Sequence, residues 1–336
     1  MRAILCCKPK VLEIVDRPMP EPKPGEALVR IRRIGVCGTD MHIYEGNQPY
    51  FAYPRVMGHE LSGEIVEASQ DSKFKAGDPV YIVPYLHCGH CIACRAGRTN
   101  CCTSLKVLGV HVDGGMCEFL AVPESHLFKA EGITLDEAAM VEFLAIGAHA
   151  VARARIEPGQ RTLVVGTGPI GVGVALFAQL NGADVTVIDG REDRLSFCTA
   201  TLGITHAVKL GPDDAEVLKA ITGGEFFHHV FDCTGSPKAM ERGFSFVSHG
   251  GTYVLVSIVQ GNISFNDPEF HKRETTLLSS RNATLADFET VMVAMRDGKV
   301  PARAINTHRA SLWEVAEKMP EWISPETGTI KALLEL

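Results

Sequence analysis

A valine-rich run followed by three spaced glycines and an apolar stretch constrains the fold of this chain more than any other feature. Arg161–Val165 is a short apolar run, and Ile170–Leu180 is apolar almost without interruption. A second apolar run, Asp184–Ile188, follows. Short apolar runs joined by a helix are typical of strands buried on both faces of a parallel sheet. The segment therefore predicts one strand–helix–strand unit of such a sheet.

The glycines that join the first run to the helix have the spacing G-x-G-x-x-G. Glycines allow a sharp turn and let backbone N–H groups approach a pyrophosphate at the helix N-terminus. Asp189 ends the next predicted strand, where a carboxylate accepts hydrogen bonds from ribose hydroxyls and repels a 2′-phosphate. This favours NAD over NADP, although Arg191 and Arg194 nearby weaken the preference. The alternative is a turn with a structural role only. The predicted cofactor residues are Gly166, Gly168, Pro169, Ile170, Gly171 and Asp189.

The chain on either side of this unit has two different characters. Residues 1–130 read as short strands separated by Gly and Pro, for example Ala27–Ile31 and Leu61–Val66, and predict a β-rich, barrel-like body. Ala-rich helical stretches follow at 135–141 and 144–154. Beyond the nucleotide loop, strand-like runs alternate with helical stretches, at 207–210, 230–233, 252–256 and 276–279.

The last part of the chain is mixed and ends in the strand-like Ile330–Leu336. It is too short to fold alone, so we expect it to return to the first domain. The predicted division is residues 1–144 as a catalytic domain, 145–279 as a nucleotide-binding domain and 280–336 as a returning segment.

Four cysteines in one short loop form the most specific motif. Cys88, Cys91, Cys94 and Cys102 have the spacing C-x2-C-x2-C-x7-C. Four thiolates suit tetrahedral zinc, and a site without an open position is structural rather than catalytic. Cys101 directly precedes Cys102, but the spacing favours Cys102 as the fourth ligand. The alternative is a set of free or redox-active thiols.

A second set of ligand types is dispersed through the chain. It consists of Cys37, the pair His59-Glu60, and Glu142. Sulfur, imidazole and carboxylate ligands with an open position are what a catalytic zinc requires. Asp40 could hold the other ring nitrogen of His59. Taken singly, each residue has a structural alternative, such as a buried thiol or a turn aspartate.

Composition excludes several classes of function. The chain has 336 residues, 46% hydrophobic and 22% charged, which is typical of a globular protein of two domains. Its net charge of −7 argues against nucleic-acid binding. No apolar run reaches membrane-spanning length and no secretory signal is visible, so eleven cysteines indicate thiols or zinc ligands in a cytoplasmic protein.

Together these motifs resemble those of the zinc-dependent medium-chain alcohol and polyol dehydrogenases, from about residue 1 to the C-terminus. Besides the four-cysteine loop and the nucleotide loop, the resemblance rests on Cys37-Gly-Thr-Asp-x-His42, Gly58-His-Glu-x-x-Gly63, Gly77-Asp-x-Val80, Asp113-Gly-Gly115 and Glu142. It implies an α/β plus β fold, with a GroES-like β-rich catalytic domain and a Rossmann doubly wound parallel sheet. It also implies two Zn²⁺ per chain, NAD, substrate at the domain cleft, and a homodimer or homotetramer.

The resemblance also implies roles for single residues. Cys37, His59 and Glu142 match catalytic-zinc positions, and Glu60 could replace Glu142 or water as a ligand. Glu142 in place of cysteine resembles the polyol and threonine dehydrogenase branches, although Phe143 stands where proline is usual in the polyol branch. Two arginines are assigned by the same resemblance: Arg194 to the adenosine ribose, and Arg281 to a position near nicotinamide and substrate.

The implied reaction is hydride transfer from a secondary alcohol, in a polyol or a sugar acid such as a hexonate, to NAD. Thr39 is expected to accept the hydroxyl proton and His42 to pass it on, although either could be an ordinary turn or surface residue. Arg281 could bind a substrate carboxylate or a cofactor phosphate. The alternatives are threonine or simple secondary-alcohol oxidation and, in another class, a non-catalytic nucleotide-binding protein that keeps the fold.

Overall fold

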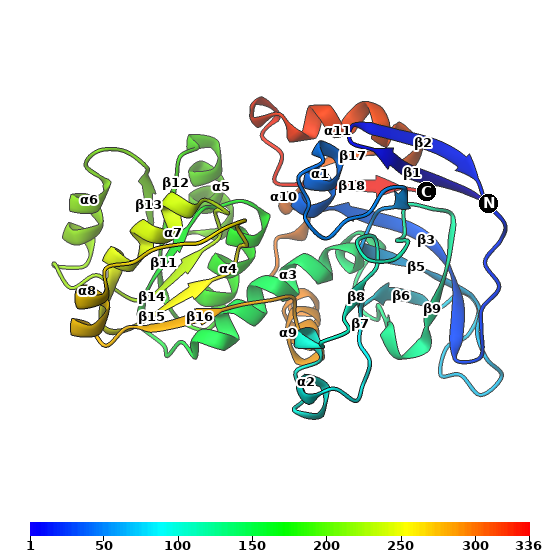
Figure 1. The fold of residues 1–336 in the computed structure, drawn as a ribbon, viewed down its shortest axis with the longest axis horizontal. Coiled ribbons are helices and arrows are strands. Elements are labelled where there is room, and N and C mark those ends of the chain that lie inside the picture. Colours follow the sequence, from blue (N-terminus) through cyan, green and yellow to red (C-terminus); the bar gives the residue numbers. More distant parts are fainter. The chain divides into compact units, whose positions relative to one another are not determined.

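The computed structural model describes residues 1–336 and divides into two compact units. The first unit comprises Met1–Glu142 and Met292–Leu336, and the second comprises Phe143–Val291. The chain passes from one unit to the other within helix α3 (Leu135–Ala154) and again within helix α9 (Leu285–Arg296). Figure 1 shows that the first unit is rich in strands, whereas the second has helices packed on a sheet.

The first unit is built around a seven-stranded sheet with the order β10-β6-β5-β3-β18-β17, with β9 also pairing with β3. A three-stranded sheet (β2-β1-β4) and the pair β7-β8 complete it. Apolar side chains of the large sheet, such as Val29, Ile31 and Leu61, are buried in one core with the helix α11 (Val315–Ile323). The strands are β1 (Arg2–Lys8), β2 (Val11–Asp16), β3 (Glu26–Val36), β4 (Arg55–Val56), β5 (Glu60–Glu67), β6 (Pro79–Ile82), β7 (Tyr85–Leu86), β8 (Lys106–Val107), β9 (Phe119–Pro123), β10 (Leu127–Lys129), β17 (Asn306–Ser311) and β18 (Lys331–Glu335).

The C-terminal strand β18 lies inside this sheet. It pairs antiparallel with β3, with Ala332 opposite Val36, and parallel with β17. Four of its five residues are buried, including Lys331. The helices of the first unit are α1 (Gly38–Glu45), α2 (Ile92–Arg95), α10 (Ala302–Ile305) and α11 (Val315–Ile323).

The second unit contains a six-stranded sheet with the order β13-β12-β11-β14-β15-β16, and every pair in it is parallel. The order reverses beside β11, and in open parallel sheets ligands bind outside the carboxyl ends of the strands at such a point. Helices α4, α5, α6 and α7 pack on these strands. The elements are β11 (Arg161–Val165), α4 (Pro169–Leu180), β12 (Asp184–Asp189), α5 (Glu192–Leu202), β13 (His206–Lys209), α6 (Asp214–Ile221), β14 (Phe227–Asp232), α7 (Pro237–Gly243), β15 (Val247–Leu255), α8 (Asp267–Lys272) and β16 (Thr276–Ser279).

The predicted combination of a β-rich body with a doubly wound parallel sheet is confirmed. The helical stretches predicted at 135–141 and 144–154 are also confirmed, and they form the single helix α3, because Glu142 and Phe143 between them do not interrupt a helix. One local interpretation was wrong. The first 130 residues also contain α1, which has almost no hydrophobic periodicity; a reciprocal capping interaction between Cys37 and Asp40 marks its start instead.

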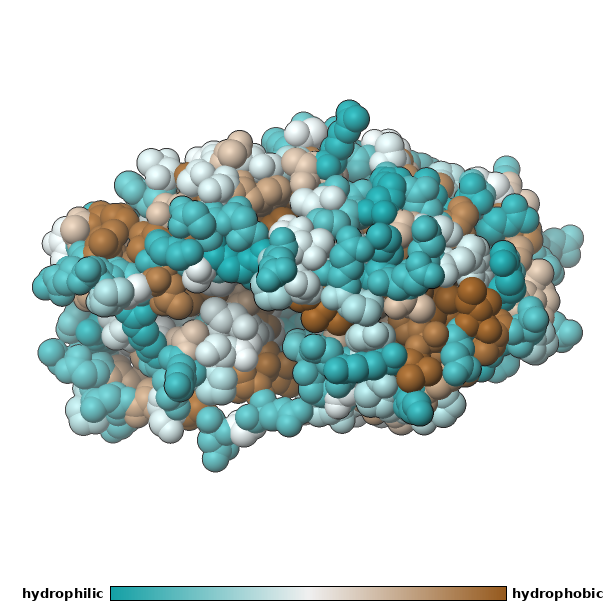
Figure 2. Space-filling view, turned by 90° about the horizontal axis from the view of Figure 1, so that it is seen from above, coloured by the Kyte–Doolittle hydropathy of each residue, from teal (hydrophilic) through white to brown (hydrophobic).

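No helix of either unit is long and apolar enough to span a bilayer. Figure 2 shows hydrophilic residues over most of one face, with apolar residues in separate patches among them. The most exposed large apolar side chains, Ile92 and Ile258, lie far apart in the sequence.

The fold predicts an acid-sensitive contact at the start of α6. Asp214 is buried, accepts from the N–H of Gly211 at 3.1 Å, and binds both terminal nitrogens of Arg242 on α7. The hydrogen bond from Arg242 holds the pKa of Asp214 below its usual value. A carboxylate whose pKa is lowered by folding stabilises the fold above its unfolded pKa and loses that contribution as pH falls through its folded pKa.

We therefore expect Asp214→Asn to lower the free energy of unfolding by about 2 kcal/mol at neutral pH. The difference from the wild type should narrow below roughly pH 4, where aspartates in the unfolded chain protonate. Urea unfolding at several pH values measures this. The exposed neighbour Asp213, whose side chain makes no capping hydrogen bond, provides the control Asp213→Asn. If the difference in the free energy of unfolding between the wild type and Asp214→Asn stayed constant down to about pH 2, the expectation would be contradicted.

Candidate functional site

Two clusters of metal-ligating side chains lie in the first unit. In the first cluster the ligand sulfurs of Cys88, Cys91, Cys94 and Cys102 all lie within 4.8 Å of one another. Zinc–sulfur bonds of about 2.3 Å in a tetrahedron place sulfurs about 3.8 Å apart. The four thiols therefore fit a closed zinc site. Cys102 is buried in this group, whereas Cys101 is exposed and outside it.

Backbone N–H groups point at these sulfurs. The N–H of Cys88 and that of Ser104 donate to the sulfur of Cys102 at 3.3 and 3.4 Å. Cys91 is the N-cap of α2 and accepts from the N–H of Cys94 at 3.5 Å. This hydrogen bond, together with one from the backbone of Thr103, lowers the pKa of Cys91 to about 5. These hydrogen bonds favour the thiolate form of Cys91, which is the form that binds zinc, whereas burial raises the pKa of Cys94 to about 12.

The second cluster brings together three of the predicted ligands, Cys37, His59 and Glu60, with ligand atoms mutually within 4.8 Å. Cys37 follows β3 and caps α1, while His59 and Glu60 lie at the start of β5. The strands β3 and β5 pair so that Gly35 stands opposite Glu60. A Cβ atom on Gly35 would lie 1.9 Å from Oε2 of Glu60, so glycine leaves the space that this carboxylate occupies.

Asp40 is buried beside His59. Its carboxylate accepts from the N–H of Cys37 at 3.0 Å and from that of Gly58 at 3.3 Å, and Oδ1 lies 3.8 Å from Nδ1 of His59. Burial alone would lower the pKa of His59, but the charge of Asp40 and the Cys37 thiol raise it well above its ordinary value. Asp40 therefore stabilises positive charge at the imidazole.

Two buried side chains that the sequence interpretation missed hold the two glutamates. Nζ of Lys331 donates to both oxygens of Glu60, at 2.7 and 2.8 Å, and both side chains are almost completely buried. The Tyr85 hydroxyl donates to Oε1 of Glu142. Lys331 had a sequence signal, since a lysine in a buried apolar strand needs a partner. Tyr85 had none.

The surroundings of the second cluster suit a cation. The charge of Glu60 acts on Asp40 and on Glu142, and His59 and Lys331 are the bases among these acidic groups. Oε2 of Glu142 is buried without a hydrogen-bond partner, whereas the buried Nδ1 of His59 faces Asp40. Burial raises the pKa of Glu142 to about 7. An unsatisfied carboxylate oxygen beside a thiol, an imidazole and a second carboxylate is what a divalent ion would compensate. The residues present therefore fit zinc.

Two further predicted residues of this unit, Thr39 and His42, lie on α1. Thr39 is half-buried and His42 is exposed, three residues further along the helix. Residues three apart lie on the same face of a helix. Glu142 lies on α3 and is not part of the three-residue ligand group, although its charge acts on His59.

The nucleotide loop of the second unit has the geometry that its glycines predict. Gly166 has φ +87°, a conformation that favours glycine. A Cβ atom on Gly171 would lie 1.9 Å from the carbonyl oxygen of Gly166, so that glycine lets helix α4 pack against the loop. Gly168 differs, because a Cβ there would meet only a side-chain nitrogen of Arg194 at 3.7 Å. Gly168 is also the N-cap of α4, without a side-chain cap, so the N–H groups of the first turn are available.

Asp189 ends β12 beside this loop. Its Oδ2 accepts from the N–H and hydroxyl of Thr167 at 2.6 and 2.9 Å, and its Oδ1 accepts from the N–H of Arg191 at 2.8 Å. Arg194 lies 4.0 Å from the same carboxylate. The structure thus brings together the predicted cofactor residues Gly166–Gly171, Asp189 and Arg194. They fit a dinucleotide whose phosphates meet the α4 N-terminus and whose ribose meets Asp189.

Arg281 lies outside these groups. It is exposed and follows β16 in the second unit.

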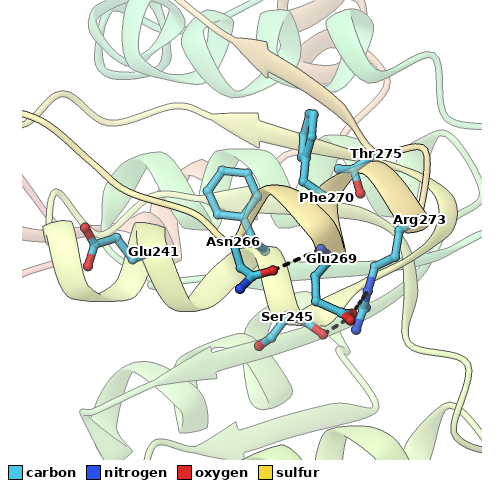
Figure 3. Close-up of a pocket in the computed structure, with 8 residues that line it drawn as sticks. Glu241, Ser245, Asn266, Glu269, Phe270, Arg273 and Thr275 are labelled. Carbon is cyan, nitrogen blue, oxygen red and sulfur yellow. Dashed lines mark hydrogen bonds and ion pairs between the residues drawn. The ribbon is translucent and has the colours of Figure 1, made fainter.

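Figure 3 shows a pocket of the second unit, distant in sequence from both clusters and from the loop. Arg273 donates to the carbonyl oxygens of Ser245 and Val247, and Asn266 caps α8 by accepting from Glu269. The polar groups drawn in this pocket are therefore largely satisfied by their own surroundings, so we place no functional site there. Its lining residues are Glu241, Phe244, Ser245, Asn266, Glu269, Phe270, Arg273 and Thr275.

Comparison with known proteins agrees with this geometry. Residues 23–132 match the model of the alcohol dehydrogenase GroES-like domain, and residues 169–297 match that of the zinc-binding dehydrogenases. The chain is 44% identical over 335 residues to L-galactonate-5-dehydrogenase of Escherichia coli, covering 99% of this chain and 98% of the relative. It is 33% identical over 303 residues to sorbitol dehydrogenase of Halalkalibacterium halodurans, covering 88% of each.

A solved structure has the same fold. The alcohol dehydrogenase RspB from Escherichia coli, crystallised with NADH, superposes with a TM-score of 0.94 at 28% identity, covering 100% of this chain and 99% of that one. The chain belongs to the zinc-dependent medium-chain alcohol and polyol dehydrogenase family. It is thus an oxidoreductase with a GroES-like domain and a Rossmann domain, as the sequence motifs predicted.

The glycine geometry separates a structural role from a ligand-binding role. Gly171→Ala should destabilise the protein by about 2 kcal/mol or more, because the added methyl group collides with backbone. Gly168→Ala should cost less than about 1 kcal/mol, the loss expected at an N-cap. It should nevertheless weaken NADH binding, because its methyl group points into the space at the helix N-terminus. Thermal unfolding and NADH titration measure the two effects. Equal losses of stability in both variants would contradict the assignment.

Proposed function

We propose that this chain catalyses NAD-dependent oxidation of a secondary alcohol in a sugar acid or polyol, at a zinc ion in the first unit. The observation that carries the proposal is the group formed by half-buried Cys37 with buried His59 and Glu60, and an unpartnered oxygen of Glu142 beside it. The 44% identity to an L-galactonate-5-dehydrogenase supports a sugar acid, a hexonate, as the substrate class.

Cys37 and His59 are the proposed constant ligands of the catalytic zinc, and one glutamate completes the set. Both oxygens of Glu60 already accept from Lys331, whereas Glu142 has Oε2 without a partner. We propose that the two carboxylates can exchange as ligand. When bound, zinc supplies a Lewis acid that lowers the pKa of an alcohol hydroxyl, and NAD supplies the hydride acceptor.

The chain itself supplies orientation and a route for the proton. Lys331 and Tyr85 each fix one glutamate from outside the ligand group, and Asp40 faces the ring nitrogen of His59. The hydroxyl of Thr39 is proposed to accept the substrate proton, and His42 to transfer it to water. Their spacing on α1 and the change from half-buried to exposed support this direction.

The four-cysteine loop is proposed to hold a second, structural zinc. Four sulfurs leave no position for a substrate, so this ion would stabilise the loop between β7 and β8 and take no part in the reaction. The protein would then contain two zinc ions per chain.

The remaining roles are proposed for the second unit and the assembly. Gly166, Gly168, Pro169, Ile170, Gly171, Asp189 and Arg194 would bind NAD. Arg281 would bind either a substrate carboxylate or a cofactor phosphate. The functional division proposed is 1–144, 145–279 and 280–336, in a cytoplasmic protein.

A homodimer or homotetramer is the proposed assembly. The strand β16 is at one edge of the parallel sheet, contains no charged residue or proline, and exposes Leu277. An uncovered edge of this kind is a template for pairing with another strand.

The second candidate is threonine or simple secondary-alcohol oxidation, which the same ligands would support. A non-catalytic nucleotide-binding protein is disfavoured because Cys37, His59 and Glu60, which offer sulfur, nitrogen and oxygen ligands, lie in one group.

A substrate panel with metal analysis tests the proposal. Purified protein should contain about two zinc ions per chain and should reduce NAD with hexonates or neutral polyols, and a chelator should abolish the NADH absorbance change. Arg281→Ala should lose activity on acids and retain it on polyols if the arginine binds the carboxylate. Activity restricted to threonine or simple alkanols would refute the substrate class. One zinc ion and no turnover would favour the non-catalytic alternative.

Tyr85 offers a test of how Glu142 is held. Tyr85→Phe removes the only hydrogen bond described for that carboxylate, so it should reduce turnover or zinc affinity roughly 10-fold to 100-fold. The matched control is Tyr253→Phe, which removes a buried hydroxyl bound to the carbonyl oxygen of Met240 in the second unit. Both variants should lose about 1 kcal/mol of stability, but only Tyr85→Phe should affect turnover or zinc. Equal turnover and zinc content in the two would show that the Tyr85 contact is structural.

A further inference from the structure

The surroundings of Asp189 contain more charge than the sequence motif alone suggests. Arg191, Arg194 and Lys209 all lie at the carboxyl end of β12 and β13 or in the first turn of α5. Three cations beside an adenosine ribose would favour a cofactor carrying a 2′-phosphate, because arginine forms strong bidentate contacts with phosphate. Taken alone, they oppose the preference for NAD that Asp189 provides.

Each of these cations is paired with a different carboxylate. Nε and Nη2 of Arg191 donate to the two oxygens of Asp193, at 3.1 and 2.5 Å. Arg194 lies 4.0 Å from Asp189, and Nζ of Lys209 lies 3.7 Å from Glu192. The first of these pairs is the closest, and it is the only one in which both carboxylate oxygens accept from one cation.

The Arg191–Asp193 pair occupies the position that decides between the cofactors. The N–H of Arg191 donates to Oδ1 of Asp189 at 2.8 Å, so its backbone is fixed beside the ribose-binding carboxylate. The side chain of Arg191 is 24% exposed and points toward Asp193, so it is not available to bind a phosphate. Asp193 and Glu192 also place negative charge at the N-terminus of α5, where a phosphate would otherwise be attracted.

We propose that Asp193 is a second specificity-determining residue for the cofactor, which prevents Arg191 from binding a 2′-phosphate. The inference rests on the proposed function, in which the nucleotide loop Gly166–Gly171 and Asp189 bind NAD. In this arrangement Asp189 repels the 2′-phosphate directly. Asp193 holds the guanidinium of Arg191 in an ion pair, so that Arg191 cannot offset this repulsion by binding the phosphate.

The test measures dissociation constants of NADH and NADPH by fluorescence titration of the zinc-replete protein. Asp193→Asn should strengthen NADPH binding roughly threefold to tenfold, the range for releasing a partly exposed ion pair toward a phosphate. NADH affinity should change by less than about twofold, since no phosphate contact is gained. Glu192→Gln is the matched control, because it removes the same charge from the same turn but its partner is Lys209.

A double-mutant cycle assigns the effect to the arginine. Arg191→Met should leave NADPH affinity nearly unchanged in the wild-type background and abolish the gain in the Asp193→Asn background. Three results would overturn the proposal: no gain in Asp193→Asn, an equal gain in Glu192→Gln, or a gain that persists without Arg191. Failure of the wild type to bind NADH would instead refute the proposed nucleotide site, so the two failures are distinguishable.

Discussion

The buried ion pair between Glu60 and Lys331 is the interaction on which the cluster of Cys37, His59 and Glu60 depends. It joins the start of β5 to the C-terminal strand β18, two strands separated by β3 in the sheet. Burying two charges is costly, and removing one partner of such a pair typically costs about 3 to 5 kcal/mol because the other charge is left uncompensated. The pair therefore specifies one register of β18, the one in which Lys331 faces the cluster.

The same ion pair distinguishes the role of Glu60 from that of the second glutamate, Glu142. Lys331 binds both oxygens of Glu60, whereas Asp40 lies beside His59 and Glu142 is bound by the Tyr85 hydroxyl. Asp40 is held by two backbone N–H groups and Glu142 by a single hydroxyl. The less restrained of the two is thus the glutamate that also has an unpartnered oxygen. A carboxylate with one fixed and one free oxygen is suited to changing partner during a reaction cycle.

The sequence predicted those features that depend on local spacing. The four-cysteine loop and the glycines of the nucleotide loop were recognisable because their ligands or turns lie within a few residues. The parallel sheet followed from apolar runs at regular intervals. Two contacts between distant side chains were not predicted: Tyr85 meets Glu142 across 57 positions, and Lys331 meets Glu60 across 271. The short helix α1 was missed because capping, rather than an apolar face, defines it. The roles of Thr39, His42 and Arg281 stay predictions.

The position of Lys331 has a consequence for biosynthesis. Every proposed metal ligand of the first unit lies within the first 142 positions, but the counter-ion for Glu60 is Lys331 in the last strand, β18. A nascent chain on the ribosome therefore exposes its ligands long before the charge that organises one of them is available. Binding of the proposed catalytic zinc would therefore be completed late, once β18 has entered the sheet between β3 and β17.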